Sequence, residues 1–437
     1  MRIVINGLWH QGVVGAACLA GRGHHVEGYD LDPERGALLR AGKQPVFEPG
    51  LAELLAEQEA AGRLRWLDDL RDATPPDVVM LMHDTPVNER DESDPTCVFE
   101  SAALLPPILR KDTVVFVTAQ VPVGTCDRLR AALSQARPDW RGGIAYGPEN
   151  LRLGQALERF LNPPLPVLGS DDPGTMDRLV ALWPDEIRWD RVSLRTAEMV
   201  KHALNTFLAS TITFANEVGN LCDEVGADGH RIAEILRREP RVGPKAMLFP
   251  GLGFAGGTLA RDVQTLRTVG DAARLDTPFL DGLWRANAAQ NQIVLRKLRV
   301  VLGGSLSDRR IAILGLTYKP DTSTLRRSAA VELADALLRE GARVSATDPR
   351  ADRAEVAAIR GLAFHESVGE AIRDADAVVL MTPWAEYRDG DLAAWCASVR
   401  NPVLIDTAPL WDARRAEDAG WQYFDIGRGR KAISCKS

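Results

Sequence analysis

The chain has no long apolar run, few cysteines and no excess of basic residues. No stretch approaches the roughly 18 consecutive apolar residues that a membrane-spanning helix needs. Its 6 cysteines lack the spacing of a metal site or a disulfide framework, which favours free thiols in a reducing compartment. A net charge of −7 argues against a nucleic-acid-binding protein, which usually carries a basic balance or stripe.

The start of the chain lacks the charged, apolar and small-residue regions of a signal peptide. What is present is an ordinary globular composition, 45% hydrophobic and 26% charged. At roughly 150 residues per domain, the 437 residues suit about three domains. We therefore expect a cytoplasmic, multidomain protein with no metal site, no nucleic-acid partner and no membrane partner.

Short apolar runs alternate with amphipathic stretches at both ends of the chain. This pattern is typical of parallel strands covered by helices. The predicted strands are Arg2–Asn6, Asp77–Met82, Thr113–Val117, Pro166–Leu168, Arg310–Leu314, Arg343–Ala346, Ala377–Met381 and Pro402–Ile405. Between these two groups, from Arg195 to about Arg299, the sequence predicts almost continuous helix, with single helices over Ala197–Val218 and Pro278–Val301.

These patterns predict an α/β fold with two Rossmann-like parallel-sheet domains joined by a long-helix core. The expected boundaries are residues 1–192, 193–300 and 301–437, with a glycine pair at 303–304 near the last one. The first predicted strand of each sheet domain reads alike, Arg2–Gly7 and Arg310–Gly315. Either both domains follow one nucleotide-binding plan, or two ordinary α/β strands happen to look similar.

A glycine-rich turn follows the first predicted strand. It reads G-x-G-x-x-G from Gly7 to Gly12, with Trp9 at the second glycine, and a predicted helix follows. Such a turn brings a pyrophosphate to a helix N-terminus. Asp30, roughly 20 residues on, suits the ribose hydroxyls of NAD, whereas Arg35 would suit the extra phosphate of NADP. The motif alone also fits a plain strand–turn–helix; the indole of Trp9 either points away from the phosphates or lines the cleft.

Further motifs occur in one order along nearly the whole chain, and with them the sequence resembles the UDP-glucose/GDP-mannose dehydrogenase family. They are Val46–Leu51 (like Y-E-P-G-L), Asp84–Pro86, Val121–Thr125 (V-P-V-G-T), Pro148–Ala156 (like P-E-F-L-R-E-G-x-A), Phe214–Glu217, Gly251–Asp262, Gly315–Thr322, Leu325–Ser328, Asp348–Pro349, Thr382–Trp384 and Ile426–Gly429. The resemblance implies an N-terminal NAD-binding Rossmann domain, a helical dimerisation core and a C-terminal domain that holds a nucleotide sugar. It also implies NAD-dependent oxidation of a sugar alcohol to a carboxylate, by two hydride transfers and a thiohemiacetal on a cysteine.

The resemblance implies three groups of site residues. The expected NAD-binding residues are Gly7, Trp9, His10, Gln11, Gly12, Asp30, Arg35, Thr85 and Gln120. The expected substrate-binding residues are Leu151, Arg241, Gly253, Phe254, Gly257, Lys319 and Arg326, with Arg241 reaching across a homodimer interface. The expected catalytic residues are Glu149, Lys201, Asn205, Thr258 and Asp262.

The resemblance also implies the roles of the catalytic residues, and the chemistry of their side chains suits those roles. Lys201 and Asn205 share one helix face at i and i+4, where a cation and an amide donor would stabilise oxygen charge on the sugar. Asp262 would accept the alcohol proton, directly or through water, and Glu149 would hold the lysine or take part in proton transfer. The plainer alternatives are a solvated lysine and an aspartate that only begins a helix.

The sequence departs from the family at four positions of one chemical step. By alignment, Thr258 takes the place of the nucleophilic cysteine, Arg261 that of a lysine, Leu153 that of a glutamate and Gln120 that of a threonine. A threonine hydroxyl needs an adjacent base to attack a carbonyl, and a leucine cannot activate water. We therefore expect one two-electron oxidation to an aldehyde or ketone. Full four-electron oxidation, redox epimerisation without net NADH and a non-catalytic nucleotide-sugar-binding protein are the alternatives.

Overall fold

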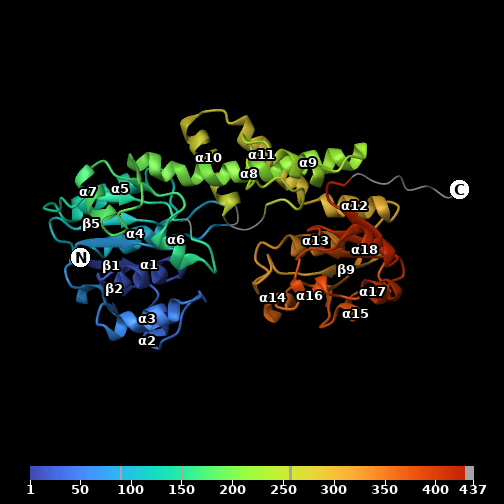
Figure 1. The fold of residues 1–437 in the computed structure, drawn as a ribbon, viewed down its shortest axis with the longest axis horizontal. Coiled ribbons are helices and arrows are strands. Elements are labelled where there is room, and N and C mark those ends of the chain that lie inside the picture. Colours follow the sequence, from blue (N-terminus) through green and yellow to red (C-terminus); the bar gives the residue numbers. More distant parts are fainter. Residues whose placement is uncertain (89–90, 150, 255–257, 429–437) are drawn as a thin grey trace. The chain divides into compact units, whose positions relative to one another are not determined.

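The computed structural model describes residues 1–88, 91–149, 151–254 and 258–428. They form two compact units, Met1–Leu204 and Asn205–Ser437. Both contain a sheet of mostly parallel strands covered by helices, which confirms the predicted α/β class (Figure 1). The three-part division at residues 192 and 300 stays a prediction. Within the described ranges, no helix is both long and apolar enough to cross a membrane.

The first unit is built on an eight-stranded sheet in the order β3-β2-β1-β4-β5-β6-β7-β8. Its strands are β1 (Arg2–Asn6), β2 (His25–Tyr29), β3 (Leu64–Trp66), β4 (Val78–Leu81), β5 (Val114–Val117), β6 (Ile144–Tyr146), β7 (Val167–Gly169) and β8 (Asp190–Val192). Its helices are α1 (His10–Gly21), α2 (Pro33–Arg40), α3 (Leu51–Ala60), α4 (Thr96–Ala103), α5 (Thr125–Ala136), α6 (Ala156–Leu161) and α7 (Pro173–Val180), with a 3-10 turn at Leu70–Asp72. All neighbouring strands run parallel except β6 and β7, which pair antiparallel.

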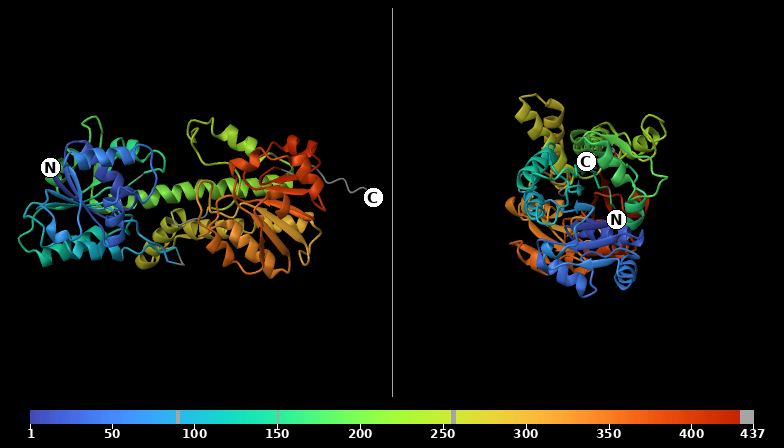
Figure 2. Two further views of the ribbon diagram at one scale, coloured as in Figure 1. Left: turned by 90° about the horizontal axis from the view of Figure 1, so that it is seen from below. Right: turned by 90° about the vertical axis from the view of Figure 1, so that its left-hand side faces the viewer.

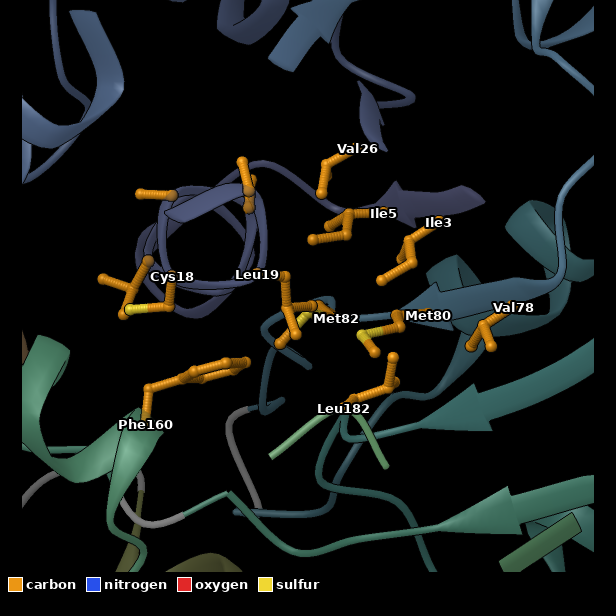
Figure 3. Close-up of a cluster of buried hydrophobic side chains, with 14 of the residues drawn as sticks. Ile3, Ile5, Cys18, Leu19, Val26, Val78, Met80, Met82, Phe160 and Leu182 are labelled. Atoms are coloured by element: carbon orange, nitrogen blue, oxygen red, sulfur yellow. The ribbon is translucent and has the colours of Figure 1, made fainter. Parts of the chain in front are cut away.

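Alternating side chains of these strands enter two separate cores, because successive residues of a strand point to opposite faces. Ile3, Ile5 and Met80 pack with α1, α3, α6 and α7 on one face (Figure 3). Val4 and Val79 pack with α4 and α5 on the other. Buried on both faces, the sheet explains why its strands read as continuous apolar runs.

The long helix α8 (Leu194–Val225) extends beyond both ends of the predicted Ala197–Val218, and the left view of Figure 2 shows it as one continuous green helix. α9 (Gly229–Leu236), α10 (Leu259–Ala273), α11 (Pro278–Gln290) and α12 (Ile293–Val301) follow. Two expectations fail here. The described residues between α9 and α10 form no helix, and the predicted helix over Pro278–Val301 is broken at residues 291–292. The break lets α11 pack against α10 while the apolar side chains of α12 enter the core of the second sheet.

The second unit carries a six-stranded, all-parallel sheet in the order β11-β10-β9-β12-β13-β14. Its strands are β9 (Arg310–Leu314), β10 (Arg343–Thr347), β11 (Leu362–Phe364), β12 (Ala377–Leu380), β13 (Val403–Asp406) and β14 (Gln422–Asp425). Helices α12 and α13 (Ala329–Arg339), with α14 (Arg353–Ala357), cover one face. The other face is covered by α15 (Val368–Ala371), α16 (Ala385–Arg388), α17 (Leu392–Ser398) and α18 (Ala413–Asp418).

The two sheets share a detail at the end of their central strands. Gly7 follows β1 and Gly315 follows β9, both with positive φ. The next residue in each case, Leu8 or Leu316, donates its backbone N–H to an aspartate after the neighbouring strand, Asp30 or Asp348. The same turn, strand neighbour and hydrogen bond in both units support one shared nucleotide-binding plan over coincidence.

Candidate active site

The turn after β1 requires glycine at two positions. Gly7 has φ +111°, and a Cβ there would lie 2.8 Å from the backbone carbonyl carbon of Met82. A Cβ on Gly12 would lie 1.7 Å from the carbonyl oxygen of Gly7. The first turn of α1 is thus held directly against the end of β1, which leaves the helix N-terminus open at the edge of the sheet. A pyrophosphate fits this arrangement.

Asp30 lies at the end of β2 with its carboxylate buried and anchored. Its Oδ2 accepts the N–H of Leu8 at 2.5 Å, its Oδ1 accepts the N–H of Asp32 at 2.9 Å, and Nη1 of Arg35 lies 3.3 Å from Oδ2. Arg35 also stacks over the indole of Trp9, 5.1 Å from the ring centroid. Asp30, Arg35 and Trp9 therefore form one cluster at the predicted ribose position.

Trp9 is the one member of the turn that departs from the dinucleotide pattern. Its backbone is extended (φ −92°, ψ −155°), its side chain makes no cap bond to α1, and the residue is 37% exposed. The ring therefore points outward to solvent and Arg35 instead of filling the turn. The turn, the helix start and Asp30 fit NAD, whereas the indole narrows the approach to them.

Several predicted cofactor residues have side chains that bind the protein itself. Gln11 is buried, donates to the carbonyl of His83 and accepts from Thr118 Oγ1. Thr85 Oγ1 donates to the carbonyl of Gln120 at 2.7 Å. These bonds tie α1 and the ends of β4 and β5 together at the edge of the sheet.

Glu149 and Lys201 meet through the main chain. Lys201 Nζ donates to the carbonyl oxygen of Glu149 at 2.6 Å, while the carboxylate of Glu149 accepts the N–H of Leu151. Glu149 and Leu151 also line a largely apolar pocket with Gln11 and Phe160. The lysine is 8% exposed, so it is not a solvated surface charge.

The second unit brings Asn205 and Asp262 together. Asn205 Nδ2 donates to Oδ2 of Asp262 at 2.5 Å, and the aspartate is 0% exposed. Arg261 Nε lies 3.7 Å from the other carboxylate oxygen. Asp262 is therefore a buried, hydrogen-bonded group in the first turn of α10. Thr258 directly precedes α10, exposed and with no cap bond from its side chain.

Three predicted substrate residues, Gly253, Phe254 and Lys319, line one pocket of the second unit with Thr317, Tyr318, Ser328 and Thr382. Arg241 and Arg326 are not among its lining residues. Arg241 is exposed and paired with Glu239, and Arg326 is exposed. Gly257 lies outside the described residues.

Comparison with known protein families covers most of the chain. Residues 1–185 match the NAD binding domain of the UDP-glucose/GDP-mannose dehydrogenase family, residues 195–289 its central domain and residues 312–413 its UDP binding domain. The chain belongs to this family. As a UDP-glucose/GDP-mannose dehydrogenase family member, it is an NAD-dependent oxidoreductase that acts on CH–OH groups.

Individual relatives agree with this placement. This chain is 33% identical to a UDP-glucose 6-dehydrogenase of Pseudomonas aeruginosa, over 100% of this chain and 99% of that protein. It is 34% identical to the enzyme of the same name from Rhizobium meliloti, covering 98% of this chain and 100% of that protein. A solved UDP-glucose dehydrogenase from Pyrobaculum islandicum superposes with a TM-score of 0.84 at 30% identity, covering 98% of each chain.

Two residues of the family member hold its site motifs together and were not predicted as site residues. The side chain of Asn287 brackets Phe254, accepting its N–H at 2.8 Å and donating to its carbonyl at 3.1 Å. Glu48 links His10 to Gly154. No sequence pattern around Asn287 marked it as a site residue. Glu48 lies in the motif Val46–Leu51, but no residue nearby in the sequence indicated that it would bind His10 and Gly154.

Proposed function

We propose that this dehydrogenase oxidises an alcohol of a UDP-sugar or another nucleoside-diphosphate sugar in one two-electron step, giving an aldehyde or ketone. The proposal rests on Thr258, which lies exposed at the start of α10 and which the sequence resemblance assigns to the position of the family's nucleophilic cysteine. The names of the relatives compared above, two UDP-glucose 6-dehydrogenases and one UDP-glucose dehydrogenase, favour a UDP-sugar.

The first oxidation uses groups that this chain retains. Lys201 and Asn205, one turn apart on α8, stabilise the negative charge that develops on the sugar oxygen. Asp262 takes up the alcohol proton, and Asn205 orients its carboxylate. The Glu149 carbonyl fixes the direction of the lysine ammonium. Gly7, Gly12 and Asp30 would hold NAD, which would supply the hydride acceptor when bound.

The chain lacks the groups that a second oxidation would use at the aligned positions. An aldehyde becomes a thioester only after a thiolate has added to it, and a threonine hydroxyl is a far weaker nucleophile without an adjacent base. Leu153, 55% exposed, has no atom that can orient or deprotonate a water molecule. The carbonyl product therefore leaves without having been bound covalently.

The test is the stoichiometry of the reaction. UDP- and GDP-sugars are supplied singly with NAD, and the NADH formed is compared with the sugar consumed, with product identification by mass spectrometry. We expect one NADH per sugar and a carbonyl product. A Lys201→Met variant, which keeps the stem of the side chain and loses the charge, should abolish turnover. Two NADH per sugar and a uronic acid would refute the single oxidation.

We also propose that two copies of the chain pair along α8. Phe207, Phe214, Leu221 and Val225 are 64%, 52%, 65% and 76% exposed. At 100° per residue they fall within about 40° of one another around the helix, so they form one apolar stripe. A contiguous exposed apolar stripe of this kind marks an interaction surface, and a second α8 offers a matching one.

The pairing is tested by sedimentation velocity. Phe214→Glu should convert a dimer into a monomer, because it buries a charge in the centre of the stripe. Phe47→Glu is the matched control: Phe47 is 82% exposed and lies in the first unit, away from α8 in the sequence. A wild-type monomer, or dissociation by both variants, would contradict the proposal.

A further inference from the structure

A buried carboxylate joins three segments of the first unit. Glu48 is 2% exposed, and its Oε1 lies 2.8 Å from Nε2 of His10. Both carboxylate oxygens accept the N–H of Gly154 at 2.9 Å, and Oε2 also accepts the N–H of Ala156 at 3.3 Å. An ionised carboxylate has no hydrogen to donate and can only accept hydrogen bonds, so the histidine donates from Nε2.

These bonds replace a missing local cap. The side chain of Gln155, the residue before α6, makes no cap bond, which leaves the first N–H groups of the helix to other partners. Glu48, more than a hundred residues earlier, supplies that acceptor for Ala156. Hydrogen bonds to a charged, buried group are stronger than ordinary ones, and an unpaired buried carboxylate would be costly.

The partners of Glu48 lie in functionally different places. His10 is the first residue of α1, directly after Trp9 in the dinucleotide turn. Gly154 ends the segment that begins at Glu149, whose carboxylate holds Leu151 and whose carbonyl holds Lys201. Glu48 thus contacts the start of α1 and the end of the stretch 151–154, whose first residue, Leu151, is bonded to Glu149, the partner of Lys201.

We propose that Glu48 is a positioning residue that couples the dinucleotide turn to residues 151–154. A pyrophosphate bound at the start of α1 fixes the backbone of His10; the ring of His10 then fixes the carboxylate of Glu48, and the carboxylate holds the amides of Gly154 and Ala156. Cofactor binding therefore orders residues 151–154, of which Leu151 is bonded to the partner of Lys201. The effect of this ordering on turnover rests on the function proposed above.

The test measures amide hydrogen exchange of the full-length protein with and without NAD, by mass spectrometry of peptides that span residues 151–161. In the wild type, NAD should slow exchange at these amides. His10→Phe keeps a ring at the start of α1 and removes the donor, so at NAD concentrations that saturate this variant by calorimetry, NAD should no longer slow exchange there. Glu48→Gln weakens the acceptor, so exchange should be about 10- to 100-fold faster even without NAD.

The matched control is Glu158→Gln, the same chemical change on the exposed side of α6, and it should behave as the wild type. Calorimetric titration with NAD confirms occupancy in every sample, and circular dichroism confirms folding. NAD-dependent slowing that persists in His10→Phe, or unchanged exchange in Glu48→Gln, would overturn the coupling.

The outcome is separable from that of the proposed function. NAD-dependent protection without turnover of any nucleotide sugar would support the coupling and refute the reaction. If the wild type turns over a nucleotide sugar but NAD does not slow amide exchange in residues 151–161, the proposed reaction is supported and the coupling is refuted. In an active enzyme, Glu48→Gln should also lower kcat, whereas a residue that only stabilises the fold would lower the melting temperature and leave kcat per folded molecule unchanged.

Discussion

Thr258→Cys restores the atom on whose absence the proposed single oxidation depends. The site accepts the change easily, because the threonine side chain is exposed and makes no cap bond to α10. Such a surface substitution should alter stability by less than about 0.5 kcal/mol. The variant should therefore fold as the wild type does and differ from it in one nucleophile.

The position should also activate the new thiol. An anion at the start of a helix is stabilised by about 0.3–1 kcal/mol, which lowers a cysteine pKa of about 8.5 by roughly 0.2–0.7. At pH 8 the thiolate fraction then rises from about one quarter to between about one third and three fifths. The buried carboxylate of Asp262, one turn into α10, opposes this effect and favours the lower end of the range.

The thiolate should add to the aldehyde made in the first oxidation, and a second hydride transfer should convert the thiohemiacetal into a thioester. Because Leu153 cannot activate water, the thioester should persist. We expect a burst of NADH of at most one additional equivalent per chain, and an intact mass increased by one acyl nucleotide sugar. Thr258→Ser, which keeps a hydroxyl, should show neither.

Two results would refute this reasoning. A covalent adduct on the wild-type chain would show that a nucleophile other than residue 258 operates. Normal first-step turnover to an aldehyde by Thr258→Cys, with no adduct and no burst, would show that residue 258 does not face the reacting carbon.

Three further predictions address the rest of the site. Trp9→Gly should bind NAD about 10-fold more tightly by calorimetry, because removal of the outward-pointing indole widens the approach to the turn and admits one more charge-assisted phosphate contact. Weaker binding would mean that the indole contributes to the site. Asn205→Leu should lower kcat by about 10²–10³-fold. Because it removes a hydrogen-bond donor to the buried Asp262, it should also reduce the free energy of unfolding by about 1.5–3 kcal/mol. An unchanged kcat would mean that Asn205 takes no part in the reaction. Burial lowers the pKa of His83 from 6.5 to about 4, so as the pH falls the unfolded chain binds the proton first, and the free energy of unfolding should fall by roughly 2 kcal/mol between pH 7 and 4.5. In urea unfolding, His83→Gln should lose that part of the pH dependence. An identical pH dependence in both proteins would contradict this role of His83.

The sequence by itself determined the sheet domains and the cofactor turn, because these depend on local features. The runs 3–5, 78–81, 311–314 and 377–380, which form most or all of β1, β4, β9 and β12, are apolar at every position, as strands buried on both faces must be. Gly7 and Gly12 are required by clashes within the turn and with the adjacent strand. The three-residue strands β3, β8 and β11 were not predicted, because each has exposed or half-buried positions and so need not form a continuous apolar run.

Only the tertiary structure decided which distant groups meet. The pattern over Pro278–Val301 suits one helix, and the break arises because α11 and α12 serve two different cores. Lys201 binds the carbonyl of Glu149 and not its carboxylate, and Glu48 caps a helix that begins more than a hundred residues later. Residue types and spacing constrain what each segment can form, whereas the pairing of buried polar groups depends on how the segments pack, which no local pattern encodes.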